Sequence, residues 1–146
     1  MATNEGEAVV ELTIPGKPEY VGVARLAILG VASRMRFSYD EVEDIRLAVG
    51  EACTTAIERA NGASSPGQEV RVRCLIDPTR LVVEVADNIS TPAGTEQPSG
   101  PEQFPDERSL GGVLIRILMD DVQVSQEPES GQHVVRMTKY AAGAAR

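Results

Sequence analysis

The chain has 146 residues, of which 42% are hydrophobic and 25% are charged. This length fits one domain, residues 1–146, that buries roughly 68–70% of its unfolded surface without disulfide or metal support. The formal net charge of −8 repels polyanions, so nucleic acid is excluded as an expected ligand and partners with basic surfaces are favoured. No apolar run of about 18 residues and no signal-peptide pattern occur, which predicts a cytoplasmic protein outside the membrane.

The first half of the chain predicts one strand followed by two helices. Alternating apolar residues indicate the strand, and apolar residues at helical intervals indicate the helices. Ser38 and Glu41 have the spacing of a capping box, which sets the start of the second helix, and Asn61-Gly62 supplies its stop signal. The expected elements are a strand over 8–14, a helix over 18–35 and a helix over 39–60.

The second half predicts two hairpins separated by a long loop and a short helix. The expected strands are 69–76, 81–86, 122–124 and 134–138, and the expected helix is 110–120. The segment 88–108 is rich in Pro, Gly, Ser, Thr, Glu and Gln, and loops of this length are commonly lids, binding loops or disordered inserts. These elements predict an α+β fold, a two-layer sandwich with helices on one face of a mixed, mainly antiparallel sheet.

The two cysteines and the single histidine are not expected to form a metal or redox site. Cys53 and Cys74 are far apart in the sequence, and each lies in an apolar segment, which is typical of buried reduced thiols. His133 has no cysteine or acidic neighbour in the sequence, so it has no partner ligands for a metal.

Glu51 is an acid at an otherwise apolar place on the second expected helix. Glu51, Thr55 and Arg59 recur at i, i+4 and i+8, so they lie on one side of that helix. A carboxylate and a hydroxyl on the same side of a helix can contact one bound ligand. The alternative is an exposed Glu51 in solvent, with Arg59 two turns away. Two interpretations are also open for Asp87 and for Gly111-Gly112. They could belong to a binding site, or Asp87 could merely end a strand and the glycines merely begin a helix.

Seven short motifs occur in one order along the chain, and their resemblance to a known family covers nearly all of it except the lid segment 88–108. They are Pro18–Gly22, Gly30–Ser33, Tyr39–Asp44, Glu51–Thr54, Val85–Asp87, Leu118–Asp120 and Met137–Tyr140. Together they resemble the anti-sigma factor serine kinases of the RsbW and SpoIIAB type. This family belongs to the GHKL superfamily of gyrase B, MutL and the histidine kinases, so the resemblance implies the histidine kinase-like ATPase (Bergerat) fold.

The resemblance implies ATP and Mg²⁺ as cofactors and a role for three residues. Glu51 matches the family's acid, which acts as general base or holds a water. Thr55 stands at the position of an asparagine that ligates Mg²⁺. Asp87 matches the aspartate that recognises adenine by accepting a hydrogen bond from its exocyclic amine.

The resemblance also implies a phosphate-binding segment whose backbone N–H groups lie at a helix start. Ser109, Gly111 and Gly112 match that segment, with Ser109 in place of its first glycine. Two further departures are Thr55 for asparagine and Ile89 for a glycine beside the adenine site. The hydroxyl of Thr55 can still ligate Mg²⁺, whereas a β-branched Ile89 resists positive φ and adds bulk. Weaker ATP binding and phosphoryl transfer than in a member with the complete motif are therefore expected.

RsbW-type proteins form homodimers that hold an alternative sigma factor away from RNA polymerase. They also phosphorylate a Ser or Thr of a STAS-domain antagonist, so the resemblance implies an anti-sigma factor with ATP-dependent protein serine/threonine kinase activity. Arg25 matches a basic position on the first helix, where the family has its partner surface. Arg34 and Arg36 are further candidates, and an ordinary solvated arginine is the alternative for Arg25.

Two other functions remain open on the same fold. One is a protein-binding switch whose nucleotide site has degenerated, with anti-sigma or stress-signalling binding but no kinase activity. The other is an activator subunit of a stress-signalling complex that binds scaffold proteins instead of a sigma factor. The departures at Thr55, Ile89 and Ser109 are the features that favour the switch.

Overall fold

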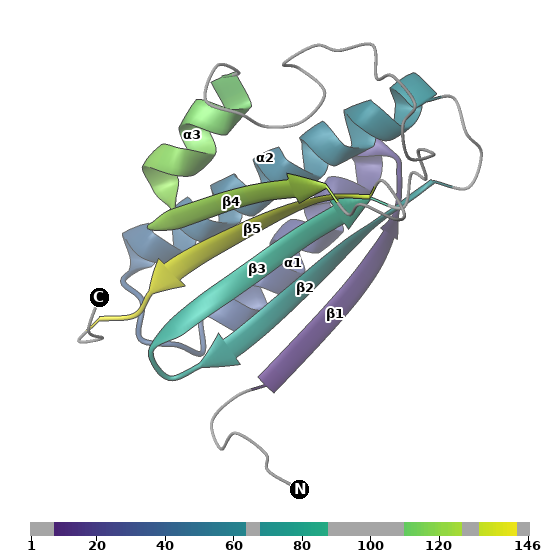
Figure 1. The fold of residues 1–146 in the computed structure, drawn as a ribbon. Coiled ribbons are helices and arrows are strands. Elements are labelled where there is room, and N and C mark those ends of the chain that lie inside the picture. Colours follow the sequence, from purple (N-terminus) through teal and green to yellow (C-terminus); the bar gives the residue numbers. More distant parts are fainter. Residues whose placement is uncertain (1–7, 64–67, 88–109, 127–131, 143–146) are drawn as a thin grey trace, which may run out of the picture.

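The computed structural model describes residues 8–63, 68–87, 110–126 and 132–142 of the chain. Within these ranges the expected strands and helices are confirmed in type and order (Figure 1). They are β1 (Ala8–Pro15), the 3₁₀ turn η1 (Pro18–Tyr20), α1 (Val21–Ala32), α2 (Tyr39–Ala63), β2 (Glu69–Asp77), β3 (Arg80–Asp87), α3 (Leu110–Leu118), β4 (Asp121–Gln126) and β5 (His133–Tyr140). The expected lid segment 88–108, which includes Ile89, lies outside the described residues, and so does Ser109.

The strands form one sheet in the order β1-β2-β3-β5-β4. Each neighbouring pair is antiparallel, so the sheet is fully antiparallel where the sequence predicted a mainly antiparallel mixture. Val72 of β2 pairs with Val85 of β3, and Val85 pairs in turn with Val135 of β5. β4 lies at the edge of the sheet, and its hairpin partner β5 pairs with β3. This pairing joins the β2–β3 hairpin to the β4–β5 hairpin.

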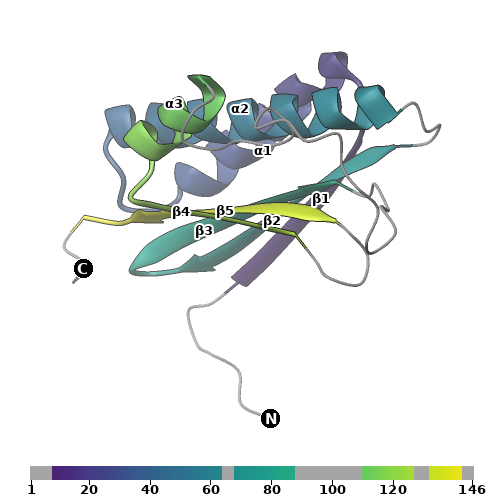
Figure 2. The same ribbon diagram turned by 45° about the horizontal axis from the view of Figure 1, so that its top comes forward.

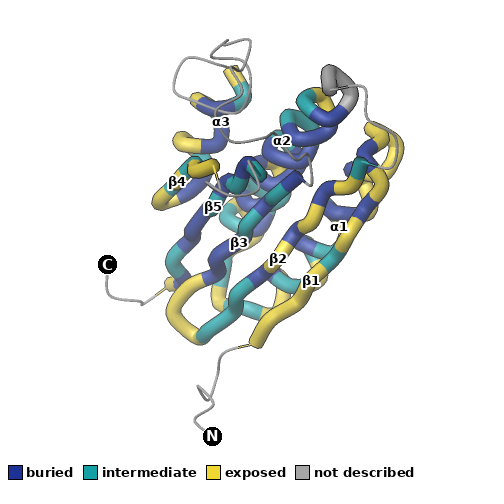
Figure 3. The backbone as a smooth tube through the Cα atoms, turned by 45° about the vertical axis from the view of Figure 1, so that its right-hand side comes forward, coloured by how far each residue is buried: buried dark blue, intermediate teal, exposed yellow. Residues whose placement is uncertain are grey.

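The helices lie together on one face of this sheet, as Figure 2 shows. Every second residue of β2 and β3 is directed at the helices, and α2 contributes residues at intervals of three and four. The resulting core contains Ile28, Ile45, Val49, Ala52, Cys53, Val70, Val72, Cys74, Val83, Val85, Ile115 and Met137. The predicted two-layer sandwich is confirmed, and α2 is its most extensively buried helix (Figure 3).

The other face of the sheet carries charged side chains that pair across neighbouring strands. Arg73 of β2 lies 3.3 Å from Glu11 of β1 and 3.7 Å from Glu84 of β3. Arg136 of β5 donates a hydrogen bond of 2.7 Å to Glu84. These partly exposed pairs contribute at most about 1 kcal/mol each, but they make this face polar. The chemistry of the sheet therefore explains why the helices cover only one side.

The capping box at the start of α2 is confirmed. The backbone N–H of Ser38 donates to Glu41 Oε1 at 2.8 Å, and the N–H of Glu41 donates to Ser38 Oγ at 3.1 Å. The end of this helix was predicted wrongly, because α2 continues past Asn61-Gly62 to Ala63. A glycine in a helix costs about 1 kcal/mol, which is too little by itself to stop a long packed helix.

Two other helix boundaries also differ from the prediction. The first helix begins as the 3₁₀ turn η1 and its α-helical part ends at Ala32, three residues before the expected Met35. The short helix α3 ends at Leu118, where Lys139 Nζ donates to the Leu118 carbonyl at 2.6 Å. A cation at the last turn satisfies an orphan carbonyl and complements the helix dipole. This cap comes from β5, so the local sequence does not reveal it.

Among the described residues, none of the helices has the length and apolar character needed to cross a membrane.

Candidate functional site

The first turn of α3 lies against the middle of α2. A Cβ built on Gly111 would be 3.1 Å from Glu51 Oε1 and 3.8 Å from Thr55 Oγ1. Glu51 and Thr55 lie on successive turns of α2, and both are half-buried. Three of the residues that the sequence suggested are thus brought to one place, although Gly111 is distant from the other two in the sequence. Figure 1 shows α3 beside α2.

This arrangement places a carboxylate, a hydroxyl and the start of a helix side by side. A helix start presents backbone N–H donors and the positive end of the dipole to an anion. Because Gly111 lacks a side chain, the Glu51 carboxylate can lie close to this helix start. If an anion binds at the helix start and a hydroxyl group attacks it, the carboxylate can accept the proton of that hydroxyl. The cluster is suited to a transfer reaction on a phosphate-bearing ligand.

The same residues fit Mg²⁺ only in company with a nucleotide. The described part of the chain contains no group of three or more His, Cys, Asp and Glu side chains that could hold a metal ion. Mg²⁺ usually takes one or two protein oxygens and obtains its remaining ligands from phosphates and water. Thr55 Oγ1 and the Glu51 carboxylate are oxygen ligands of this kind, so the donor set is compatible with a magnesium–nucleotide complex.

Asp87 ends β3 as a fully buried carboxylate that is paired with Arg59 of α2. Arg59 donates to Asp87 Oδ2 through Nε at 2.8 Å, and its second terminal nitrogen lies 2.7 Å from the same oxygen. The Asp87 side chain is 0% exposed and that of Arg59 is 8% exposed. Burial lowers the pKa of Arg59, and the charge of Asp87 opposes that effect. Arg59 is thus engaged with Asp87, and Glu51, the acid that the alternative placed in solvent, is half-buried.

The start of β5 supplies further polar neighbours of Asp87. Gln132 donates its side-chain amide to the Asp87 carbonyl, and His133 Nδ1 lies 3.7 Å from Asp87 Oδ2. The register explains this contact, since Ala86 pairs with Val134 and His133 therefore comes beside Asp87. A cavity of about 60 Å³ near the end of β3 is lined by Thr13, Glu69, Arg71, Ala86, Asp87 and Gln132, and the exposed Thr13 and Arg71 belong to the sheet face that the helices do not cover.

Gln132 and His133 are site neighbours that sequence reasoning missed, and so is the pairing of Arg59 with Asp87. The position of Arg59 on the stripe of Glu51 and Thr55 could be found from the sequence. Gln132 and His133 could not, because their place depends on the pairing of β3 with β5.

The two clusters lie on one side of α2. Glu51 and Arg59 are two helical turns apart, or about 12 Å along the axis, and Thr55 is between them. Gly112 is buried beside Gly111, and Ser109 lies outside the described residues. An elongated ligand along this side of α2 would have its anionic end near Gly111 and its other end near Asp87.

Arg25 lies across α2 instead of extending into solvent. A Cβ built on Gly50 of α2 would clash with Arg25 Nε and lie 3.0 Å from its Cζ. The guanidinium thus rests on the bare backbone of Gly50 and is half-buried. It also opposes the effect of burial on Cys53, whose pKa burial raises to about 12. Arg25 is thus partly buried against α2, and its role as a partner contact stays a prediction.

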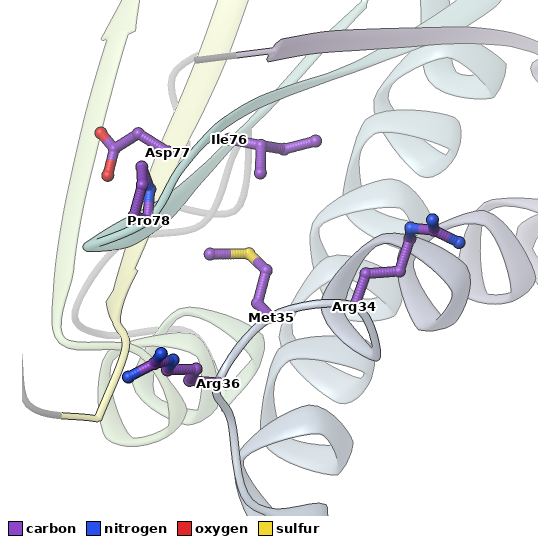
Figure 4. Close-up of a pocket in the computed structure, with 6 residues that line it drawn as sticks. All are labelled: Arg34, Met35, Arg36, Ile76, Asp77 and Pro78. Carbon is purple, nitrogen blue, oxygen red and sulfur yellow. The ribbon is translucent and has the colours of Figure 1, made fainter. Parts of the chain in front are cut away.

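A cavity of about 270 Å³ lies at the opposite end of the sheet from Asp87. It is bounded by the segment after α1 and by the β2–β3 turn, and its lining residues are Arg34, Met35, Arg36, Ile76, Asp77 and Pro78. Figure 4 shows Met35 directed toward Ile76 and Pro78, with the two arginines on either side. Apart from Arg34 and Arg36, none of the candidate residues from the sequence lines this cavity.

Comparison with known proteins connects these observations to one family. The family model described as a histidine kinase-like ATPase domain matches residues 14–139. The chain is 41% identical over 139 residues to the serine-protein kinase RsbW of Bacillus licheniformis, covering 90% of this chain and 84% of that protein. It is also 41% identical over 142 residues to the serine-protein kinase RsbW of Bacillus subtilis, covering 92% and 86%.

Solved structures support the fold. The RsbU and RsbW domains of a Mycobacterium tuberculosis protein match with a TM-score of 0.65 at 11% identity, covering 94% of this chain and 34% of that one. The histidine kinase domain of a blue-light activated kinase from Erythrobacter litoralis matches with a TM-score of 0.54 at 19% identity, covering 94% and 69%. At these identities the likeness concerns the fold alone.

Proposed function

This chain belongs to the RsbW serine-protein kinases of the histidine kinase-like ATPase family, and from this membership we propose that it is an anti-sigma factor with kinase activity. It sequesters an alternative sigma factor, and it phosphorylates a Ser or Thr of a STAS-domain antagonist with ATP and Mg²⁺. It acts in the cytoplasm as a homodimer of single-domain chains, in which 88–108 has the lid role that the resemblance implies.

The contact of Gly111 with Glu51 and Thr55 carries the kinase half of this proposal. Glu51 accepts the proton of the attacking hydroxyl, and Thr55 is an oxygen ligand of Mg²⁺. The backbone N–H groups at Ser109, Gly111 and Gly112 bind phosphate. Positioning and charge compensation then do most of the work in phosphoryl transfer.

Asp87 is the base-recognition residue in this proposal. Asp87 contacts Arg59, which is two helical turns from Glu51 on α2. This separation suits a nucleotide that extends along α2. Arg25 is the proposed partner contact on α1, where Gly50 supports its guanidinium.

Transfer of labelled phosphate tests the kinase half directly. The purified chain is incubated with labelled Mg-ATP and a STAS-domain antagonist, and binding to the sigma factor is measured on the same preparation. Transfer to one Ser or Thr of the antagonist is the expected result. A preparation that binds the sigma factor but transfers no label would reject the kinase half and leave the anti-sigma half standing.

The second candidate is a binding switch without kinase activity. The observation in its favour is that the Asp87 carboxylate already has a buried guanidinium partner, in addition to threonine at the magnesium position. Calorimetry with Mg-ATP separates the two candidates. A chain that binds its protein partners but gives no heat with Mg-ATP is the switch, whereas saturable heat that Asp87→Asn abolishes supports the kinase.

A further inference from the structure

We propose that the cavity between the segment after α1 and the β2–β3 turn is a docking site for an acidic segment of a partner protein, in which an apolar residue stands between carboxylates. The cavity is at the end of the β2–β3 hairpin where Asp77 pairs with Arg80, and Asp87 is at the other end. This inference therefore goes beyond the proposed function and requires no bound nucleotide.

Both walls of the cavity are held by backbone hydrogen bonds to the residues that follow β5. On one wall, the Arg36 carbonyl accepts a hydrogen bond of 3.1 Å from the N–H of Ala142. At the β2–β3 turn, the Thr79 carbonyl accepts one of 2.8 Å from the N–H of Ala141. Because Ala141 and Ala142 are consecutive, they connect the two walls. The cavity is thus formed before a ligand binds, which is usual for binding sites.

The only carboxylate that lines the cavity, that of Asp77, is engaged within its own turn. Its Oδ1 accepts hydrogen bonds from the Thr79 N–H at 2.7 Å, from the Thr79 hydroxyl at 2.6 Å and from the Arg80 N–H at 3.0 Å. Arg80 Nε lies 3.7 Å from Asp77 Oδ2. The negative charge of Asp77 is therefore compensated inside the turn.

Two arginines give the cavity a positive rim. Arg34 and Arg36 are exposed, and Figure 4 shows them on either side of Met35. Of the ion pairs within the described part of the chain, none includes either arginine. A guanidinium binds a carboxylate through two parallel N–H donors, so each arginine can bind one carboxylate of a ligand.

The rim attracts an acidic ligand although the chain as a whole has a net charge of −8. At physiological salt the screening length is about 8 Å, so a carboxylate at the rim interacts mainly with the nearest charges. The more distant negative charges of the chain are screened. Local attraction by Arg34 and Arg36 therefore outweighs the general repulsion of an acidic segment.

The floor of the cavity between the arginines is apolar. Met35 and Ile76 are half-buried and pack against the hydrophobic core, and Pro78 is exposed at the turn. A small anion such as acetate would leave most of this apolar surface in water, whereas an aliphatic side chain would cover it. The floor therefore favours a ligand that brings an apolar group together with its anionic groups.

The size of the cavity favours a peptide over a cofactor-sized molecule. Its volume of about 270 Å³ is below the range of roughly 300–1,000 Å³ that is usual for small-molecule sites. A cavity of this size can take one apolar side chain. The arginines on either side then meet the residues before and after that side chain, which explains the preference for Asp or Glu at those positions.

Titration of the full chain with synthetic peptides tests this inference. The probe is a short fluorescent peptide with a central leucine between glutamates, and fluorescence anisotropy measures its binding. We expect saturable binding with a dissociation constant below about 1 mM. Replacement of the leucine by serine should weaken binding at least about tenfold, because the floor stays exposed. Replacement of the glutamates by glutamines should weaken it at least about fivefold.

Variants of the chain locate the effect at the rim. Arg34→Gln combined with Arg36→Gln should weaken binding of the glutamate peptide at least about fivefold and leave binding of the glutamine peptide unchanged. Arg71→Gln is the matched control, because Arg71 is an exposed arginine of β2 outside this cavity, and affinity should stay within about twofold. Circular dichroism establishes that each variant is folded.

Amide NMR spectra of the wild-type chain show where the peptide binds. Addition of the glutamate peptide should shift the signals of Met35 and Ile76 and leave those of Glu51 and Thr55 in place. Shifts concentrated elsewhere would overturn the inference. The absence of saturable binding, or unchanged affinity in the folded double variant, would do the same.

Two further outcomes would assign the cavity to another occupant. Equal affinity for the leucine and serine peptides would indicate a simple anion site. Loss of self-association in the double variant, measured by analytical ultracentrifugation, would indicate that a second copy of the chain covers the cavity. Either result would overturn the inference and leave the kinase proposal intact, because phosphate transfer is measured without these peptides.

Discussion

Gly111 of α3 lies so close to Glu51 of α2 that a Cβ on Gly111 would be 3.1 Å from the Glu51 carboxylate. Such a distance is tighter than most real Cβ contacts, so any side chain at this position must displace the carboxylate by a few tenths of an ångström. The absence of a side chain at Gly111 is therefore part of how the acid is held at the start of α3.

We expect Gly111→Ala to reduce phosphoryl transfer to the antagonist by at least about tenfold, because small displacements of reacting groups are costly. Stability should change by less than about 1 kcal/mol, since the higher helix propensity of alanine offsets the closer contact. Initial rates and thermal unfolding measure the two effects. The control is Gly30→Ala on α1, where a Cβ meets open space and ATP affinity should stay unchanged. Full activity in Gly111→Ala would contradict the proposed place of Glu51.

Glu51→Gln should lower the transfer rate by about 10²–10⁴-fold, because glutamine cannot accept the proton of the attacking hydroxyl. ATP affinity and sigma binding should remain within about threefold, since the amide preserves size and shape. Glu58→Gln is the matched control, as Glu58 is an exposed acid two turns further along α2. Equal loss of activity in both variants would show that Glu51 has no special role.

Gly50→Ala should weaken binding to the partner proteins as much as Arg25→Ala does. The added methyl group would occupy the place of the Arg25 guanidinium, which is the flexible end of a long side chain and can move away. The fold should therefore be retained and can gain up to about 1 kcal/mol from alanine in the helix. Binding titrations with the sigma factor and thermal unfolding test this. Normal partner affinity in a well-folded Gly50→Ala would exclude Arg25 as a contact.

Both cysteines should resist alkylation in the folded protein. Burial raises the pKa of Cys53 from 9.0 to about 12 and that of Cys74 from 9.0 to about 11, so both remain thiols at pH 8. Iodoacetamide should label them only after unfolding, with Cys53 protected at least as well as Cys74. Rapid labelling of the native chain at pH 8 would contradict their burial.

The raised pKa values of Cys53 and Cys74 also predict that the fold loses stability at alkaline pH. A pKa that is raised on folding means that the folded state holds the proton more tightly than the unfolded state. The stability is therefore complete below about pH 9 and declines as the pH rises toward the folded pKa values of about 11 and 12. Replacement of both cysteines by alanine should reduce the slope of unfolding free energy against pH in this range, and an unchanged slope would be inconsistent with these shifts.

Removing one member of the Arg59–Asp87 pair should destabilise the fold by about 3–5 kcal/mol, because the other charge is left buried without a partner. Asp87→Leu combined with Arg59→Met should be less destabilising than the sum of the single changes. Urea unfolding of the four proteins measures this coupling. Additive effects would show that the pair is not the reason for the burial of either charge.

Local sequence patterns predicted most of the fold because each depends on a few neighbouring residues. The alternation in β2 and β3, the turn between them and the capping box of Ser38 and Glu41 all act over three or four positions. The stop signal at Asn61-Gly62 failed, because packing of α2 against the sheet outweighs a cost of about 1 kcal/mol. Signals that compete with tertiary packing were therefore the least dependable.

The site was only half accessible from the sequence. The resemblance to RsbW-type kinases singled out Glu51, Thr55, Asp87 and the glycines, and the structure brings Gly111 to Glu51 and Thr55. The partner of Asp87 was missed, because Arg59 lies 28 positions away and is joined to it only when α2 crosses the end of β3.

The sequence by itself determined the elements, their order, the family and the side of α2 that carries Glu51, Thr55 and Arg59. These follow from local periodicity and from motifs that persist whatever the partner surfaces are. Only the tertiary structure decided that the first turn of α3 lies beside Glu51. It also decided that Arg25 rests on Gly50 and that Arg59 pairs with Asp87. The physical reason is that contacts between distant segments depend on strand register and helix packing, which no short stretch of sequence specifies.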